Sequence, residues 1–207
     1  AGLERYYQIA KCFRDESQRS DRQPEYTQLD LEMSFVTQED ILQLIEGMTV
    51  SVINELIAEF DLEKDQIAPF PRFTYDESMA RYGCDKPDIR FGLELFDLSE
   101  AVQGTEFGVF KGTLEAGGKI RGVRFPGGAS LSRKEVGELE EFAKSFGAKG
   151  MASIAITSAG QGSENEFTGA GGLVAKAGFL KFLQPEQIEA ILGASGAEAG
   201  DLLCIIA

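Results

Sequence analysis

The 207-residue sequence has no histidine at all and only three cysteines. Without an imidazole, these residues cannot form a Ser-His pair, a histidine general base or a histidine-ligated metal site. The cysteines are odd in number, lie far apart at Cys12, Cys84 and Cys204, and never form a Cys-x-x-Cys pair. This pattern argues against a disulfide framework and a zinc site, and it favours the reducing cytoplasm.

Long apolar runs are also missing. No uninterrupted run approaches the roughly 18–20 residues that a membrane span needs, so we expect a soluble protein without a membrane partner. The first residues, AGLERYYQIAKCF, have neither a signal-peptide layout nor an initiating methionine. They read like the middle of a domain, and we therefore expect an internal fragment.

Positive charge is scarce, because the formal net charge is −14. A protein that binds nucleic acid by coating phosphates relies on clustered lysine and arginine, which this composition argues against. The charges are uneven: residues 1–22 carry five basic and four acidic side chains, whereas residues 25–66 carry eleven acidic ones and only Lys64. Any contact with nucleic acid is therefore expected to be local.

The first part of the chain predicts two strands and two helices. Residues 6–16 and 26–36 alternate as strands do, and apolar residues over 38–60 follow the spacing of an amphipathic helix. Thr37, with Asp40 three residues later, predicts a capping box at the start of that helix. A second, short helix is expected to begin after Thr74, with Glu77 as its reciprocal capping partner, and to stop at Gly83.

The composition of the sequence changes after about residue 91, since twenty of the 24 glycines lie from Gly104 onward. None of the glycine-rich stretches matches G-x-x-x-x-G-K-[ST], so turns and loops explain them better than a phosphate-binding loop. The runs FGVFKG, KIRGVRF and MASIAIT predict short strands. Further helices are expected from a capping box at Ser132 and Glu135 to Gly147, and between Pro185 and Gly193. We therefore predict an α+β fold with a boundary near residue 90 and two domains, 1–90 and 91–207.

One face of the predicted hairpin is strongly polar. Side chains alternate along a strand, so one face of the two strands is expected to carry a common set of residues: Arg14, Glu16, Tyr26, Gln28, Asp30, Glu32 and Ser34. The connecting segment, about 17–24, adds Arg19 and Arg22. Such a face is often only the solvent side of an antiparallel sheet. Here Asp30 and Glu32 would repel each other without a nearby cation, which favours a binding site for an ammonium or guanidinium group.

The order of residues in this hairpin resembles motif 2 of the class II aminoacyl-tRNA synthetases. The motif F-R-x-E, a loop, and then R-x-x-x-[F/Y]-x-x-x-D corresponds here to Phe13-Arg14-Asp15-Glu16, Arg22, Tyr26 and Asp30. The string DRQPEYTQLDLEMSF is similar to the aspartyl branch, since lysyl and asparaginyl relatives usually have histidine where this chain has Gln23. The segments RYGCDKPDIR and RFPGGASLSRKEVGELEEFAKSFGAKG resemble the insertion domain of bacterial-type aspartyl enzymes. The resemblance thus predicts a partial class II antiparallel sheet with helices over 1–90, followed by an α+β insertion domain over 91–207.

The resemblance implies a ligase that activates aspartate with ATP and transfers it to the 3′ end of tRNA. It implies that Arg14 is catalytic and binds both the ATP phosphate and the aspartate carboxylate. ATP would also contact Asp15, Glu16, Gln23 and Tyr26, and aspartate would be held through its ammonium by Asp30. Arg19 and Arg22 would contact the tRNA acceptor end.

Other parts of that machinery are absent from the sequence. Motif 1, which helps to form the dimer interface of a homodimeric parent, and motif 3, whose arginine binds ATP, are both missing. Magnesium is expected in the parent enzyme, but its ligands would lie outside this chain, and no metal ligand is assigned here. We expect the fragment to be inactive alone. The alternatives are a non-enzymatic tRNA-binding module and an amidotransferase-like tRNA adaptor, although the related amidotransferase subunit lacks motif 2.

Overall fold

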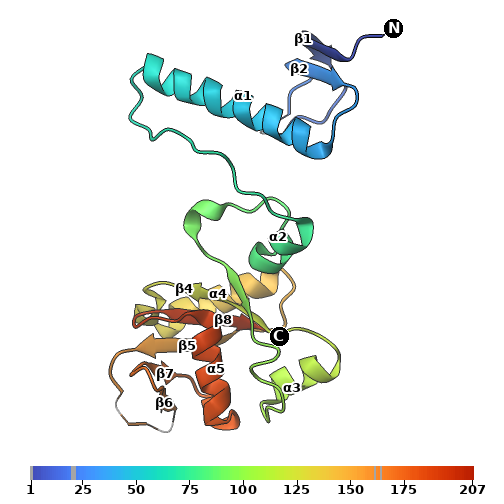
Figure 1. Ribbon diagram of the computed structural model, residues 1–207. Coiled ribbons are helices and arrows are strands. Elements are labelled where there is room, and N and C mark those ends of the chain that lie inside the picture. Colours follow the sequence, from blue (N-terminus) through green and yellow to red (C-terminus); the bar gives the residue numbers. More distant parts are fainter. Residues whose placement is uncertain (1, 20–21, 161, 164) are drawn as a thin grey trace. The chain divides into compact units, whose positions relative to one another are not determined.

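The computed structural model describes residues 2–19, 22–160, 162–163 and 165–207. Its described residues form helices and antiparallel sheets, the α+β class expected from the sequence (Figure 1). They divide into two compact units between Arg72 and Phe73, and not at the boundary predicted near residue 90. Residues after Phe73 belong to the second unit because Arg81 donates from Nε to a Glu94 carboxylate oxygen at 2.8 Å, and Arg121 reaches the Met79 carbonyl at 3.5 Å.

The first unit begins with the expected hairpin, in which β1 (Arg5–Phe13) pairs antiparallel with β2 (Glu25–Met33). Both strands are shorter than predicted. Pro24 has no N–H to continue the ladder, so β2 begins directly after it. Phe35 has a φ of +61°, which ends the extended backbone beyond Met33. Of the connecting segment 17–24, residues 20 and 21 lie outside the described residues.

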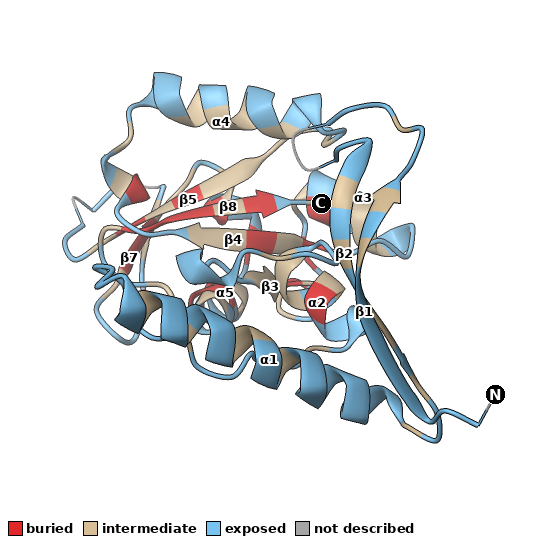
Figure 2. Cartoon of the chain, turned by 90° about the horizontal axis from the view of Figure 1, so that it is seen from above, coloured by how far each residue is buried: buried red, intermediate tan, exposed pale blue. Residues whose placement is uncertain are grey.

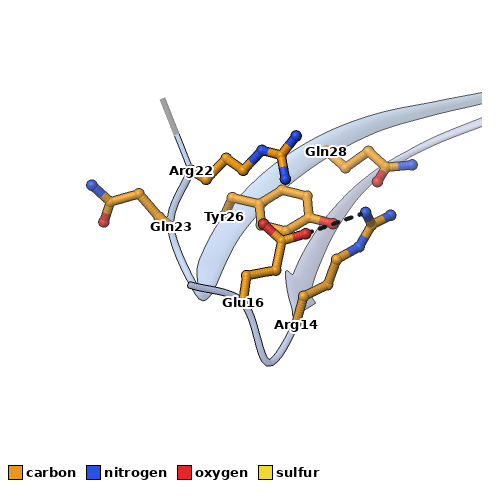
Figure 3. A pocket seen from close by; sticks show the side chains of 6 residues that line it. All are labelled: Arg14, Glu16, Arg22, Gln23, Tyr26 and Gln28. Atoms are coloured by element: carbon orange, nitrogen blue, oxygen red, sulfur yellow. Dashed lines mark ion pairs between the residues drawn. The ribbon is translucent and has the colours of Figure 1, made fainter. Parts of the chain in front are cut away.

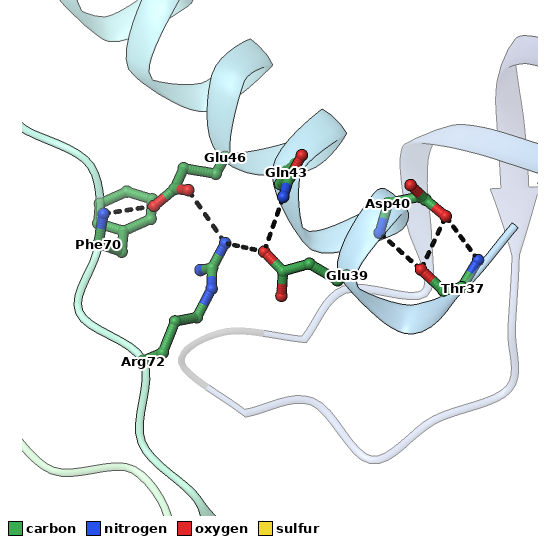
Figure 4. Close-up of polar contacts among 7 residues, drawn as sticks. All are labelled: Thr37, Glu39, Asp40, Gln43, Glu46, Phe70 and Arg72. Carbon is green, nitrogen blue, oxygen red and sulfur yellow. Dashed lines mark hydrogen bonds and ion pairs between the residues drawn. The ribbon is translucent and has the colours of Figure 1, made fainter.

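Helix α1 (Gln38–Glu59) begins with the predicted capping box. The Thr37 N–H donates to the Asp40 carboxylate at 2.7 Å, and the Asp40 N–H donates to the Thr37 hydroxyl at 3.3 Å (Figure 4). The bond from the Thr37 N–H, and then that from its hydroxyl, holds the pKa of Asp40 below its usual value. The sequence of this one turn therefore determines where the helix begins.

The chain after α1 runs back along the helix and is held there by polar contacts. The Asn54 amide exchanges two hydrogen bonds with the backbone of Ile67, at 2.8 and 3.1 Å. Glu46 accepts from the Phe70 N–H and pairs with the Arg72 guanidinium at 3.0 Å (Figure 4). These contacts fix residues 67–72 against one side of α1.

The remainder of α1 is left uncovered. None of its 22 residues, all of them described, is buried, as the pale blue and tan helix in Figure 2 shows. By length and composition alone α1 is long enough and apolar enough to cross a membrane, although a single such helix is weak support for a membrane segment. Polar residues such as Glu46 and Asn54 interrupt its apolar sequence, so α1 reaches this average hydropathy without a long uninterrupted apolar run.

The second unit is built, in its described residues, on a six-stranded antiparallel sheet in the order β3-β4-β8-β5-β7-β6. Its helices and strands are, in chain order, α2 (Tyr75–Tyr82), β3 (Leu95–Asp97), α3 (Gly108–Glu115), β4 (Arg121–Phe125), α4 (Arg133–Ser145), β5 (Ala152–Thr157), β6 (Glu166–Thr168), β7 (Val174–Lys176), α5 (Pro185–Ser195) and β8 (Leu202–Ile206). Helices α4 and α5 lie on opposite sides of this sheet in both views (Figures 1 and 2).

The hydrophobic core lies in this second unit, where the buried residues of Figure 2 gather in the sheet and in α5. Ile154 of β5 and Leu203 of β8 are fully buried, as is Ile191 of α5. In the first unit, by contrast, no described residue belongs to a buried core cluster. The apolar surface that stabilises folding is therefore concentrated after Phe73.

The helix ends in the second unit can be compared directly with those predicted from the sequence. The capping boxes at Thr74 and Ser132 are both confirmed, and α2 ends as predicted at Gly83, which has a φ of +74°. The expected end of α5 at Gly193 is wrong. The helix continues to Ser195, and Gly196 adopts the left-handed conformation that ends it, with a φ of +56°.

The run FGVFKG was predicted as a strand, but it lies in helix α3. Phe107 precedes the helix, and Phe110 and Leu114 follow at the three- and four-residue spacing of one helix face. Phe110 is buried, and the other two pack against the same core. The two remaining predicted strands, in KIRGVRF and MASIAIT, are confirmed as β4 and β5.

A close approach at Gly122 in β4 gives a test of this core. A Cβ at Gly122 would lie 2.6 Å from the Phe96 ring and 2.9 Å from the Cys204 carbonyl oxygen. We expect Gly122→Ala to lower the free energy of unfolding by about 1–3 kcal/mol, as overpacking does. Urea denaturation of the whole chain measures this change.

The matched control is Gly137→Ala in α4, where nothing lies within 4 Å of the added Cβ. That substitution should leave stability unchanged or raise it by up to about 1 kcal/mol, because alanine favours helix over glycine. Equal urea midpoints for Gly122→Ala and the unchanged chain would show that the approach at Gly122 is not as tight as described.

Candidate active site

A hollow of about 560 Å³ lies at the loop end of the hairpin. Figure 3 shows the six side chains that line it: Arg14, Glu16, Arg22, Gln23, Tyr26 and Gln28. The first five were singled out from the sequence as site residues. The structure therefore brings together, from β2 and from the two ends of the segment that connects the strands, most of the residues that the motif contains.

Backbone pairing explains why these residues meet. The Arg14 N–H donates to the Pro24 carbonyl at 2.8 Å, which continues the hairpin contact one step beyond β1. The Arg22 N–H donates to the Arg19 carbonyl at 3.2 Å and closes the connecting segment on itself. Arg14 and Arg22 are thereby held at the same end of the hairpin.

Arg14 is in contact with two other residues of this hollow. One of its terminal nitrogens lies 3.9 Å from a Glu16 carboxylate oxygen, and its guanidinium lies 5.6 Å from the centre of the Tyr26 ring. The Arg14 side chain is still 62% exposed, so the ion pair contributes little to stability. Its planar guanidinium remains open to a ligand on the solvent side.

The charges that line the hollow are suited to an anion. Two guanidinium groups face a single carboxylate, that of Glu16. No ion pair of Arg22 is found within the described part of the chain, and in Figure 3 its side chain points toward that of Gln28. Gln23, although it lines the hollow, points away from the other five side chains (Figure 3). Phosphate or carboxylate oxygens are the groups that such a pair of arginines binds.

Gln28 lines the hollow, although the sequence assigned it only to the polar face and gave it no role. Its side-chain oxygen lies 3.9 Å from the Cys12 sulfur, a weak contact across the two strands. The signal that points to Gln28 is its position two residues after Tyr26, which puts both on the same face.

Three of the residues singled out from the sequence do not line this hollow. Asp15 is exposed outside it, and Arg19 forms a backbone bridge with Arg22. Asp30 lines a neighbouring hollow of about 530 Å³ farther along the same face, together with Glu4, Gln8 and Glu32. The polar face thus has an arginine-rich part near the loop and an acidic part farther away.

A larger cavity of about 880 Å³ lies in the second unit, but it fits a site less well. Its aromatic residues pack against one another: Phe107 stacks on Phe179 at 4.9 Å and meets Phe110 edge-on at 4.8 Å. Glu140 and Lys149 are the charged residues in its lining. These rings belong to the core of the unit, and no residue of the motif lies there.

Among the residues that the structure describes, no group of three or more aspartate, glutamate, histidine or cysteine side chains could hold a metal ion. The magnesium that the resemblance implies therefore finds no set of ligands in the described part of this chain. The three cysteines, all within the described ranges, are free thiols.

Comparison with known proteins gives one consistent result. The sequence model for tRNA synthetases class II (D, K and N) matches residues 1–187. The chain is 45% identical over 207 residues to the aspartate–tRNA(Asp/Asn) ligase of Symbiobacterium thermophilum, covering 100% of this chain and 32% of that protein. It is 47% identical over 207 residues to the ligase of the same name from Caldanaerobacter subterraneus, with the same coverage. It is also 47% identical over 204 residues to the aspartate–tRNA ligase of Shouchella clausii, covering 98% and 31%. The chain spans about a third of the length of the curated relatives it matches.

Proposed function

The chain belongs to the class II tRNA synthetases of the D, K and N group, and from this premise we propose that it is a segment of an aspartate–tRNA ligase. The full-length protein would join aspartate to ATP, forming aspartyl-adenylate, and then transfer the aspartyl group to tRNA. The observation that carries this proposal is the hollow in which Arg14, Glu16 and Tyr26 meet at the end of the hairpin. The choice of aspartate as the amino acid substrate is supported by the names of the relatives, which are aspartate–tRNA ligases.

Arg14 has the central role in the proposed first step. An oxygen of the aspartate α-carboxylate attacks the α-phosphorus of ATP, the bond to the bridging oxygen breaks, and pyrophosphate leaves. Negative charge accumulates on the α-phosphate oxygens as this happens. A planar guanidinium with two parallel donors can bind a phosphate oxygen and the incoming carboxylate together, and can hold them in line. The high exposure of Arg14 leaves its donors available for this task.

The residues around Arg14 would orient it and hold the nucleotide. Glu16, 3.9 Å from the guanidinium, would help to orient it. The Tyr26 ring lies against the guanidinium and offers a flat surface to the adenine base. We propose that Asp15, Glu16 and Gln23 contact ATP, and that Asp30 binds the substrate ammonium.

The second proposed step, transfer of the aspartyl group to tRNA, would involve the arginines of the connecting segment. A ribose hydroxyl of the terminal nucleotide of tRNA attacks the aspartyl carbonyl carbon, and AMP leaves with the electrons of the anhydride bond. Arg19 and Arg22 are proposed to contact the acceptor end, since arginines in a loop position phosphates without a requirement for a continuous basic surface. This local contact agrees with the overall acidity of the chain.

We propose that the full-length ligase is a cytoplasmic homodimer without a membrane partner, and that the uncovered surface of α1 packs against protein. Magnesium is assigned no step in this chain because the described residues offer it no cluster of ligands. We further propose that the hairpin and α1 are part of the catalytic core, and that the sheet of the second unit is the insertion domain.

Aspartate-dependent exchange of pyrophosphate into ATP by the full-length protein tests this function. We expect exchange with aspartate and none above background with lysine or asparagine. Exchange with one of those two amino acids instead would assign the protein to another branch of the family. If the protein binds tRNA but supports no exchange with any amino acid, the tRNA-binding alternative replaces the ligase.

A further inference from the structure

Gln8, on β1, contacts Asp30 on the polar face of the hairpin. Gln8 is directly opposite Asp30 in the strand register. Its side-chain amide donates to one Asp30 carboxylate oxygen at 3.3 Å, and both residues line the acidic hollow. Asp30 follows Gln28 by two residues, so the two lie about 7 Å apart along the strand on the same face.

We propose that Gln8 is a positioning residue for the amino acid substrate, because it fixes the Asp30 carboxylate while leaving its charge uncompensated. The inference rests on the proposed function, in which Asp30 binds the ammonium of aspartate. It adds a residue outside motif 2 that determines how well Asp30 can do so.

The charges around Asp30 explain why a neutral donor matters there. Glu32 lies two residues away on the same face, and Glu4 lines the same hollow. Among the described residues, Asp30 forms no ion pair with lysine or arginine, and the Gln8 amide is its hydrogen-bonding side chain. Repulsion from the neighbouring carboxylates would turn an unsupported Asp30 toward solvent.

A basic residue in place of Gln8 would also hold Asp30, but it would neutralise the carboxylate. An amide supplies the hydrogen bond without a positive charge. The second Asp30 oxygen then remains free to accept from a substrate ammonium in a charge-assisted bond, which is stronger than a neutral one. The choice of glutamine opposite Asp30 therefore suits a site that must attract a cation.

Steady-state exchange kinetics of the full-length protein test this role with three substitutions at one position. Gln8→Ala and Gln8→Met both remove the donor, and methionine keeps the length of the side chain. Each is expected to raise KM for aspartate about 3- to 10-fold, the usual effect of one lost hydrogen bond. Gln8→Lys is expected to raise it more, on the order of 100-fold, because lysine would pair with Asp30. KM for ATP should stay within about twofold in all three variants, because none of the residues proposed to bind ATP lines the hollow that contains Gln8.

Lys11→Ala is the matched control, because Lys11 lies on the same strand and its side chain is exposed on the opposite face. It should leave both KM values unchanged. Thermal melting shows that each variant is folded. Asp30→Asn should raise KM for aspartate at least as much as Gln8→Ala does.

The outcomes separate this inference from the proposed function. Wild-type exchange with aspartate, a raised KM in Asp30→Asn and an unchanged KM in Gln8→Ala would overturn the role of Gln8 alone. Recovery of wild-type KM by Gln8→Met would also overturn it, because packing and not hydrogen bonding would then be responsible. Without aspartate-dependent exchange by the wild type, the proposed function fails, and the role of Gln8 fails with it.

Discussion

Arg14→Lys in the full-length ligase is expected to lower the turnover of aspartate-dependent ATP–pyrophosphate exchange by roughly 10²- to 10³-fold, the usual cost of one preorganised electrostatic donor. Lysine keeps the positive charge but loses the two parallel donors that can bind a phosphate and a carboxylate at once. It also loses the flat surface that lies 5.6 Å from the Tyr26 ring centre. The change is therefore not conservative at this position.

Lys11→Arg provides the control for this substitution, since it exchanges the same two residue types on the other face of the hairpin. Lys11 lies 4.0 Å from Glu25 and its side chain is 77% exposed, so exchange should not change. KM for ATP and kcat should be measured together. We expect Arg14→Lys to lower kcat, because the lost donor is needed mainly in the transition state. If the turnover of the Arg14→Lys enzyme stays within about threefold of that of the wild type, Arg14 does not bind the phosphate as proposed.

The 207-residue chain by itself is expected to make no aspartyl-adenylate. Its sequence has neither motif 1 nor motif 3, so only one of the arginines that the family uses on ATP is present. The structure adds a second reason. Arg14 is 62% exposed, and at so exposed a position the high dielectric constant of the solvent strongly weakens the attraction between a guanidinium and a phosphate. A site that is neither closed nor complete is not preorganised for catalysis.

The measurement is the same exchange assay, with the purified chain at high concentration and the full-length protein as the positive control. Circular dichroism should first show the expected mixture of helix and strand, so that inactivity is not the result of unfolding. Aspartate-dependent exchange above a boiled sample would contradict the prediction. It would mean that the hairpin alone supplies enough contacts to position ATP and aspartate.

Helix starts were readable from the sequence because their cause is local. At Thr37, Thr74 and Ser132 the capping hydrogen bonds join residues only three positions apart. The strand alternation around Tyr26 is equally local, and it identified the polar face before the register was known. The composition of the family motif then pointed to most of the residues that line the hollow at the loop.

Features that depend on distant contacts were harder to read. The run FGVFKG is too short to show a helical period, and α3 is recognised from Phe107, Phe110 and Leu114 packing into one core. The strand β8 was not predicted, yet it lies in the middle of the sheet between β4 and β5. Its run LLCII is apolar throughout, as expected for a strand that is buried on both sides, and such a run has no alternation to detect.

The sequence by itself identified motif 2 of the class II synthetases in this chain. It also determined where the capped helices begin and which face of the hairpin is polar. These properties follow from residue types at fixed, short spacings. Only the tertiary structure decided that the units divide after Arg72, that Asp30 lies in a different hollow from Arg14, and that Gln8 contacts Asp30. Each of these depends on which residues meet across 13 or more positions of sequence, as Arg81 meets Glu94. Strand register and packing determine such contacts, and the local pattern does not contain them.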